Sequence, residues 1–345
     1  MVMKPQKVQE SSKASKGIAQ HAHTDLQALI GGQSVELLKA LHILTREGQL
    51  NQDSRRKLKQ VNHLVQLLEG PLRACALEQG TSDARPLSLV DHGAGKSYLG
   101  FILYDRFGLE RSQSRGLGLE HEEGQSVQSK SINAGERADQ ASISPSEPIA
   151  LKVIAIESRP ELVERSTQLA KAFGFKGMQF LNVLAQDAGE VKGIPEQVDV
   201  VTALHACDSL SDDAIEFALA KKARLIFLVP CCQAEAASVL KSNRALLLNK
   251  TPLAELWRHP LHTRELGSQL TNVLRCLYLE AMGYTVTVTE LVGWEHSMKN
   301  ELLVAKYTGH PKAKAAQRLL DLIQQFGLEP LLAARFSRVH ESLKA

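Results

Sequence analysis

Short apolar runs alternate with helical patterns through the middle of this chain. The runs cover 87–92, 149–157, 198–204 and 223–229. Each run ends in, or is followed by, an acid, a histidine or a proline–cysteine turn. Near-continuous apolar runs separated by helices are typical of parallel strands that are buried on both faces. The pattern predicts an α/β fold whose strands share one carboxyl edge, because crossovers between parallel strands are right-handed.

Helical periodicity flanks this region on both sides. One apolar stripe lies in 34–79 at Leu37, Leu38, Leu41 and Leu44, and a second at Leu58, Val61, Leu64, Val65 and Leu68. After the last run come a helical pattern over about 263–282, ended by Gly283, and two strand-like runs at 284–294 and 301–307. Two amphipathic patterns at 310–326 and 328–343 follow. We expect a hairpin that closes the sheet and helices at both ends.

Composition divides the chain further. Residues 1–24 and 111–148 are poor in large apolar residues and rich in polar ones. Such segments bury too little apolar surface to offset the entropy lost on ordering. The sequence therefore predicts a disordered tail (1–24), a helical region (25–80), a main domain (81–308) with a disordered insertion (111–148), and C-terminal helices (309–345).

The turn after the first run carries the strongest chemical signal, LSLVDHGAGKSYLG at 87–100. Gly93 and Gly95 lack a Cβ, so the turn can adopt positive φ and a ligand can approach the backbone. A helix predicted to begin near Tyr98 offers free N–H groups. The spacing is neither G-x-G-x-x-G nor G-x-x-x-x-G-K-[ST], which disfavours a dinucleotide or a nucleoside triphosphate. A tight strand-to-helix turn without a ligand is the alternative.

The second run ends in Glu157, followed by Ser158, Arg159 and Pro160. A carboxylate at the carboxyl end of a strand can accept hydrogen bonds from both vicinal hydroxyls of a ribose. Glu157 is therefore our candidate for binding an adenosine ligand. A solvated acid at a strand end is the alternative.

Two further strand ends carry reactive side chains. His205 and Asp208 follow the third run, and Asp213 to Glu216 has the pattern of a capping box for the next helix. Pro230, Cys231, Cys232 and Gln233 follow the fourth run.

Together these motifs resemble class I S-adenosylmethionine (SAM)-dependent methyltransferases. The resemblance is closest to a branch with DHGAGK-Y-L at the first strand of its sheet, an LHACD-type segment at the fourth strand and PCCQ at the fifth strand. The third and fourth apolar runs of this chain correspond to that fourth and fifth strand. The resemblance covers about 55–308. A segment H296-S-M-K-N300 before the last strand is similar to that branch's histidine…lysine-asparagine element. The branch includes tRNA ribose methyltransferases with CCH at the fifth strand. Here Gln233 replaces that histidine, which puts transfer of their substrate in doubt.

The resemblance implies a Rossmann-like seven-stranded methyltransferase sheet, with the seventh strand inserted antiparallel between the fifth and sixth. It also implies SAM as the cofactor. Asp91, Gly93 and Gly95, with Lys96, would face its methionine part, Glu157 would bind the ribose, and Asp187 would border the adenine.

The acceptor pocket is expected between 205–208 and 230–233, because the carboxyl ends of neighbouring parallel strands meet there. Cys231, Cys232, Gln233, Lys299 and Asn300 are its candidates, with Lys59 from a basic helix face as a further substrate contact. His205 or Asp208 could act as a base. Equally, His205 could pack beside the cofactor and Asp208 could cap a helix. A nucleophilic role for Cys231 or Cys232 is disfavoured, because buried cysteines usually pack as small hydrophobes.

Net charge, cysteine content and the lengths of the apolar stretches bear on the class of protein. The net charge is +3, which by itself does not imply nucleic acid. Five cysteines without a C-x-x-C pair indicate neither a disulfide framework nor a structural zinc site, and we expect no metal. No apolar stretch reaches the roughly 18–20 residues that span a bilayer, and the amino terminus has no signal-like segment. We expect a cytoplasmic enzyme with no membrane partner.

Three functions fit the sequence. The favoured one is a SAM-dependent methyltransferase acting on RNA, supported by the branch's tRNA members and by Arg55, Arg56, Lys57 and Lys59. The second is the same reaction on a protein or small molecule. The third is a SAM-binding module without catalysis. The sequence leaves open the acceptor atom and the oligomeric state.

Overall fold

The computed structural model describes residues 33–48, 51–108, 147–204, 209–230, 234–242, 251–291, 301–341 and 343. The predicted tail and most of the predicted insertion (111–146) lie outside these ranges. Contacts divide the chain into two compact units, Met1–Leu68 and Glu69–Ala345. None of the helices in the described ranges combines the length and apolar character that a bilayer crossing needs.

The first unit contains helix α2 (Val35–Ala40) and the beginning of α3 (Gln52–Gln79). Ser34 caps α2 by accepting a hydrogen bond from the Leu37 N–H. All four leucines of the predicted stripe are buried, but α2 ends at Ala40, so Leu41 and Leu44 lie beyond the helix and do not share a helical face with Leu37 and Leu38. Helix α3 ends in the second unit and contains Pro71.

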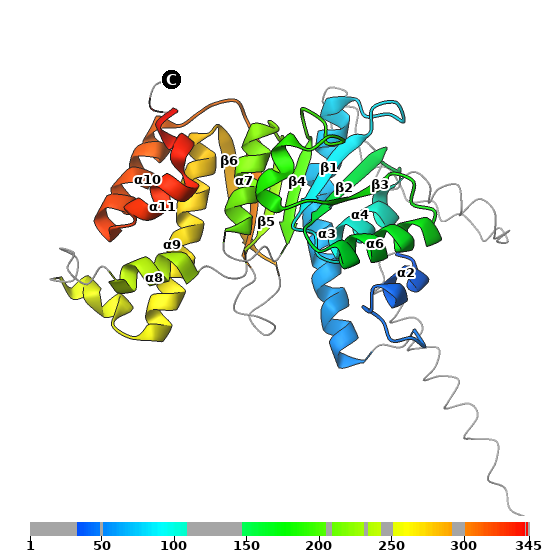
Figure 1. Ribbon diagram of the computed structural model, residues 1–345, viewed down its shortest axis with the longest axis horizontal. Helices are drawn as coiled ribbons and strands as arrows, with labels where there is room; N and C mark the ends of the chain where they lie inside the picture. Colours follow the sequence, from blue (N-terminus) through cyan, green and yellow to red (C-terminus); the bar gives the residue numbers. More distant parts are fainter. Residues whose placement is uncertain are drawn as a thin grey trace, which may run out of the picture. The chain divides into compact units, whose positions relative to one another are not determined.

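The second unit contains a seven-stranded sheet in the order β3-β2-β1-β4-β5-β7-β6 (Figure 1). The strands are β1 (Leu87–His92), β2 (Leu151–Glu157), β3 (Met178–Asn182), β4 (Val200–Leu204), β5 (Leu225–Val229), β6 (Tyr284–Glu290) and β7 (Glu301–Tyr307). Strands β1 to β5 are parallel. Strand β7 is antiparallel to both β5 and β6 and lies between them. This arrangement confirms the predicted fold class.

Helices follow most of the strands. They are α4 (Tyr98–Phe107), α6 (Pro160–Ala172), α7 (Leu210–Ala220), α8 (Ala234–Ser242), α9 (Pro260–Ala281), α10 (Ala313–Phe326) and α11 (Glu329–Arg335), with the 3₁₀ helices η1 (Ala185–Glu190), η3 (Pro252–Trp257) and η4 (Ser337–Glu341). Gly100 brings α4 so near to β2 that a Cβ there would lie 3.1 Å from Val153 Cγ1. Helices α8, α9, α10 and α11 lie together at the β6 end of the sheet (Figure 1).

Two predicted helix boundaries are wrong. Helix α7 begins at Leu210, so Asp213 and Glu216 lie inside it and form no capping box. Glu216 instead accepts a hydrogen bond from the Tyr278 hydroxyl. The predicted helix 328–343 ends at Arg335, and η4 follows it. There the buried Phe336 ring packs edge-on against Tyr278, with centroids 5.4 Å apart.

The strand order reverses between β1 and β4. From β1 the chain steps outward to β2 and β3, then returns to β4 and continues to β5 on the other side. Asp91 on β1 is in register with Thr202 on β4. In open parallel sheets ligands bind outside the carboxyl ends of the strands at this reversal. The topology therefore puts the end of β1 at the expected binding position.

Candidate functional site

The turn after β1 adopts left-handed backbone at three positions. Gly93, Gly95 and Ser97 have φ of +67°, +59° and +51°. The Ala94 N–H donates to the Ile156 carbonyl at 2.9 Å, and the Gly95 N–H donates to Glu157 Oε2 at 2.8 Å. These hydrogen bonds tie the turn to the end of β2. Ser97 is not a glycine, and strained backbone of this kind is concentrated at functional sites.

The described residues leave space above the turn. Among them, a Cβ placed on Gly93 would meet no atom within 4 Å, and one on Gly95 would meet Arg159 Nη2 at 3.8 Å. Positive φ, rather than crowding by the protein, is therefore what favours glycine here. None of the described residues therefore blocks a ligand from approaching the backbone on this side.

Asp91 is a buried carboxylate beside this opening. Its Oδ1 accepts a hydrogen bond from Thr202 Oγ1 at 2.9 Å, and Ser97 Oγ lies 3.4 Å from its Oδ2. Burial raises the pKa of Asp91 to about 6, although the hydrogen bonds from Thr202 and Ser97 oppose the shift. No salt bridge to Asp91 is found in the described part of the chain. A cationic group that binds here would favour the ionised carboxylate.

Glu157 is surrounded by donors from its own chain. The Arg159 backbone N–H and Nε donate to Oε1 at 3.0 and 2.8 Å, and Arg159 Nη2 donates to Oε2 at 3.2 Å. Burial raises the pKa of Glu157, but the hydrogen bonds and charge of Arg159, with the Gly95 N–H, outweigh this and hold the pKa below its usual value. The carboxylate is thus ionised and close to saturated. A ribose could bind it only by replacing the Arg159 side chain.

His92 connects the turn to η1. Its ring is fully buried, and its Nε2 lies 3.1 Å from the Ala185 carbonyl oxygen, to which it must donate. Burial lowers the pKa of His92 to about 4, so the ring is neutral at physiological pH. Its Nδ1 is buried without a partner among the described residues. The contact fixes the start of η1, where Leu184 and Asp187 are exposed.

The other predicted residues fall into two groups. Lys96 is exposed, with Nζ 5.8 Å from the centroid of the Tyr98 ring, and Lys59 is exposed in the first unit. Outside the described residues lie His205, Asp208, Cys231, Cys232, Gln233, Lys299 and Asn300. Of the predicted site residues, Asp91, Gly93, Gly95 and Glu157 are the ones that the structure brings together at the ends of β1 and β2.

Sequence reasoning missed four contributors to this site. Thr202 and Ser97 contact Asp91, Arg159 pairs with Glu157, and His92 holds η1. A buried hydroxyl in an otherwise apolar run, as in VDVVTAL, was a signal for Thr202. Arg159 follows Glu157 by two residues, but nothing in the sequence showed that its side chain turns back. Within the described ranges, no cluster of three or more His, Cys, Asp or Glu could hold a metal ion.

A family model described as a methyltransferase domain matches residues 56–144 and 140–239, which together cover more than half of the chain. No curated protein matches the sequence.

Solved structures match with low scores. Magnesium protoporphyrin IX methyltransferase from Synechocystis PCC 6803 is 13% identical, with 80% of this chain and 96% of that chain covered and a TM-score of 0.38. The plantazolicin methyltransferase is 10% identical, with coverages of 83% and 100% and a TM-score of 0.35. An rRNA methylase from Streptococcus thermophilus is 10% identical, with coverages of 67% and 92% and a TM-score of 0.31. Scores at this level carry no argument about the substrate.

Proposed function

The chain belongs to this methyltransferase-domain family and is a SAM-dependent methyltransferase, and from that premise we propose that its acceptor is RNA. The observation that carries the cofactor assignment is the buried Asp91 carboxylate beside the open glycine turn at the sheet's reversal point. SAM carries a sulfonium and an ammonium group, and both complement a buried carboxylate that forms no salt bridge with the described residues.

The described residues suit the other parts of the cofactor. Gly93 and Gly95 leave room at the backbone, and Glu157 offers acceptors for ribose hydroxyls once Arg159 moves aside. Leu184, with 54% of its surface exposed, offers apolar surface for a purine beside Asp187. Lys96 is exposed at the rim of the same turn.

When bound, SAM supplies a methyl group that is already electrophilic, so the protein mainly has to align the acceptor atom and exclude water. On transfer, the acceptor atom would form the new bond to the methyl carbon, and the SAM sulfur would keep the electron pair of its former bond to that carbon. We propose that His205 or Asp208 takes the proton that an oxygen or nitrogen acceptor loses. Cys231, Cys232, Gln233, Lys299 and Asn300 would shape the acceptor pocket.

RNA as the acceptor has two lines of support. The resemblance to a branch with tRNA-modifying members favours it, although Gln233 departs from that pattern. Exposed Arg55 and Lys59 on α3 provide positive charge, which is the main requirement for binding a phosphate backbone.

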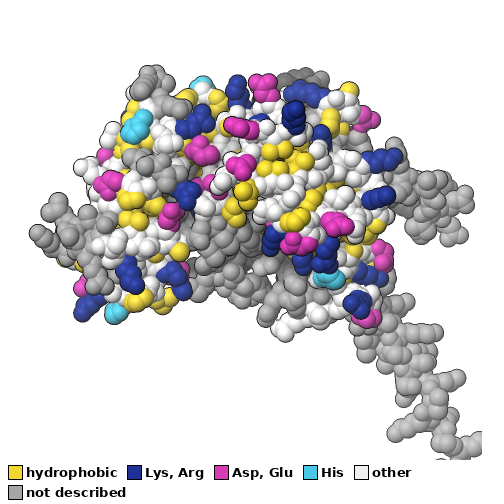
Figure 2. Space-filling view, in the orientation of Figure 1, with side chains coloured by type: hydrophobic (Ala, Val, Ile, Leu, Met, Phe, Trp, Pro, Cys, Tyr) yellow, Lys and Arg dark blue, Asp and Glu magenta, His cyan; other side chains and the backbone are white. Residues whose placement is uncertain are grey.

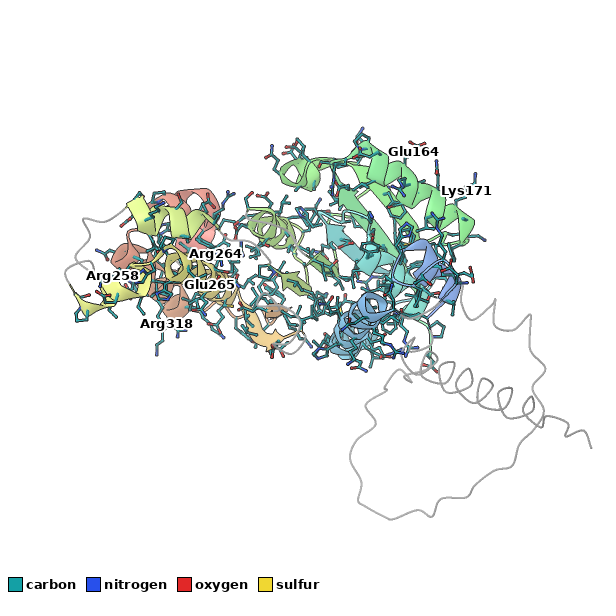
Figure 3. The ribbon with its side chains drawn as sticks, turned by 90° about the horizontal axis from the view of Figure 1, so that it is seen from below. Glu164, Lys171, Arg258, Arg264, Glu265 and Arg318 are labelled. Carbon is teal, nitrogen blue, oxygen red and sulfur yellow. The ribbon has the colours of Figure 1, made fainter. Side chains whose placement is uncertain are left out.

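The test is methyl transfer from labelled SAM to separated RNA, protein and metabolite fractions. We expect label in the RNA fraction. Glu157→Ala should weaken SAM binding in calorimetry by about tenfold or more, because it removes an ionised acceptor of two hydrogen bonds. Glu164→Ala is the matched control, since Glu164 lies on the outer surface of α6 (Figure 3). Label in protein or metabolites would refute the RNA proposal, and equal SAM affinity in both variants would refute the ribose assignment.

A further inference from the structure

A cavity of about 760 Å³ lies among α8, η3 and the beginning of α9. Its lining residues are Ala234, Ala237, Ser238, Leu240, Lys241, Ala254, Glu255, Arg258, Pro260, Thr263 and Arg264. We call it the α8–α9 groove. It contains none of the cofactor-site residues described above. Ala234, at one end of the groove, directly follows the predicted pocket residue Gln233 in the chain.

Small residues line part of the groove. Helices α8 and α9 approach closely at Gly267, where a Cβ would lie only 2.6 Å from the Ala237 backbone nitrogen. A larger residue at 267 would push the helices apart, so the groove is built by the packing of the fold. Ala234, Ala237 and Ala254 then leave space between the elements that carry the charged rim.

Among the described residues that line the groove, three are cations and one is an acid. Lys241, Arg258 and Arg264 are all exposed, and Glu255 is the acid among the lining residues. Figure 2 shows Lys and Arg side chains gathered on this part of the surface, at the lower left. Figure 3 shows Arg258 and Arg264 at the helical end of the unit, away from α6 with Glu164 and Lys171. The groove is therefore a concave surface with positive charge.

The cations are available to a ligand. Arg258 pairs with Glu255 at 3.1 Å and Arg264 with Glu265 at 3.1 Å, but the two guanidinium side chains are 65% and 60% exposed. Solvent screens such pairs, so they hold the side chains only weakly. Lys241 has no hydrogen bond or ion pair within the described residues. A phosphate that contacts any of these cations therefore breaks no buried interaction.

The beginning of α9 adds to this charge. Pro260 and Thr263 line the groove from the first turn of a 22-residue helix that has no acid in that turn. The cap residue His259 makes no side-chain hydrogen bond to the turn. The positive end of the helix dipole is thus not neutralised by its own sequence.

We propose that the α8–α9 groove binds the phosphate backbone of the RNA acceptor, next to the nucleotide that is methylated. The inference rests on the proposed function. The exposed cations suit phosphates, and the small residues of the lining leave room for sugars and bases. Ala234 lines the groove and lies only five residues after the end of β5 at Val229, so a strand held in the groove can continue toward the carboxyl edge of the sheet. The α8–α9 groove would thus hold the RNA at a place separate from the cofactor site.

The test compares two triple variants in binding a fluorescein-labelled, single-stranded 20-nucleotide RNA of mixed sequence. Lys241→Gln, Arg258→Gln and Arg264→Gln remove the groove cations. Arg165→Gln, Lys171→Gln and Lys222→Gln remove three exposed cations outside the groove. The groove variant should bind at least tenfold more weakly at moderate salt, and its log K against log[salt] slope should be less steep by about 2, since each phosphate contact contributes about 0.7. The control should bind within twofold of the unmodified protein.

SAM affinity, measured by calorimetry, should stay unchanged in both triple variants, which shows that each one is folded. Equal RNA binding by the groove variant and the control would overturn the proposal. Binding of a polyglutamate peptide through the same three cations, without binding of RNA, would also overturn it. If label reaches RNA but the groove variant methylates RNA like the control, the groove proposal fails alone. If label reaches only protein or metabolites, the proposed function fails as well.

Discussion

Two arginine–carboxylate pairs hold the two sides of the carboxyl edge, and they are built in opposite ways. Arg159 and Glu157 pair at 2.8 Å in the cofactor corner, with the arginine side chain 59% exposed. Arg275 of α9 and Asp212 of α7 pair at 2.7 Å on the helical side, with side chains 1% and 5% exposed. The first pair can exchange with solvent or a ligand, whereas the second cannot.

The buried pair belongs to a larger network. Arg275 Nη2 donates to Asp212 Oδ2 at 2.8 Å, and Arg275 Nη1 donates to Asn272 Oδ1 at 3.2 Å. Asn272 Nδ2 then donates to Glu301 Oε2 at 2.5 Å, at the first residue of β7. One arginine therefore ties α9 to the beginnings of α7 and β7. Helix α7 closely follows the segment that holds the predicted His205 and Asp208, and β7 directly follows the segment that holds the predicted Lys299 and Asn300.

The difference shows how the same chemistry serves two purposes. A buried, bidentate pair fixes the elements from which the acceptor side is built, because breaking it would leave an unpaired charge in the interior. An exposed pair keeps Glu157 ionised and satisfied until a ligand competes for its oxygens. We expect the helical side to govern stability and the cofactor corner to govern binding.

The largest expected effect is on stability, from breaking the buried pair. Arg275→Met should lower the free energy of unfolding by roughly 3–5 kcal/mol, because Asp212 would stay buried without its cation. Urea denaturation measures this. Arg264→Met, an exposed position on the same helix, should change it by less than about 1 kcal/mol. The double variant Arg275→Met with Asp212→Leu should recover much of the loss. A small effect of Arg275→Met alone would show that the pair is not a stabilising element.

A smaller effect, dependent on pH, is expected at Asp91. Its pKa in the folded protein, about 6, lies above the ordinary value of 3.8, so the folded state binds the proton more tightly than the unfolded chain. The stability from this group is complete below about pH 4 and is lost as the pH rises through 6. Asp91→Asn removes the buried charge but keeps an acceptor for Thr202. Its stability relative to the unmodified protein should therefore increase by roughly 2–3 kcal/mol from pH 4 to pH 7.5, as a pKa difference of this size implies.

Chemical denaturation at several pH values, with SAM absent, measures this difference. Thr202→Val is the matched control, because it keeps the carboxylate and removes a hydrogen bond that stabilises the charged form. In Thr202→Val the free energy of unfolding should therefore fall by more between pH 4 and pH 7.5 than it does in the unmodified protein. A stability difference that does not change with pH would contradict a raised pKa at Asp91.

The strand pattern predicted the sheet because parallel strands buried on both faces leave a strong signal. The apolar runs correspond to β1, β2, β4 and β5, and the two later runs form the β7–β6 hairpin. Strand β3 gave no such signal, since only Met178 of its residues is buried. Asp91, Gly93, Gly95 and Glu157 could be predicted from strand ends. The Arg159 contact and the Arg275 network could not, because they depend on side-chain directions and on residues distant in sequence.

The smallest expected effect is on SAM affinity, from removing the exposed arginine of the first pair. In Arg159→Ala the Glu157 carboxylate keeps the Gly95 and residue-159 backbone N–H donors but loses the guanidinium. If ribose hydroxyls take the freed positions, calorimetry should show SAM binding two- to fivefold more tightly, up to about 1 kcal/mol, the size expected for an ion pair whose arginine is 59% exposed. Arg165→Ala, an exposed arginine of α6, should leave the affinity unchanged. Binding more than tenfold weaker in Arg159→Ala would show instead that the arginine holds the cofactor, and that both pairs at the edge are fixed parts of the site.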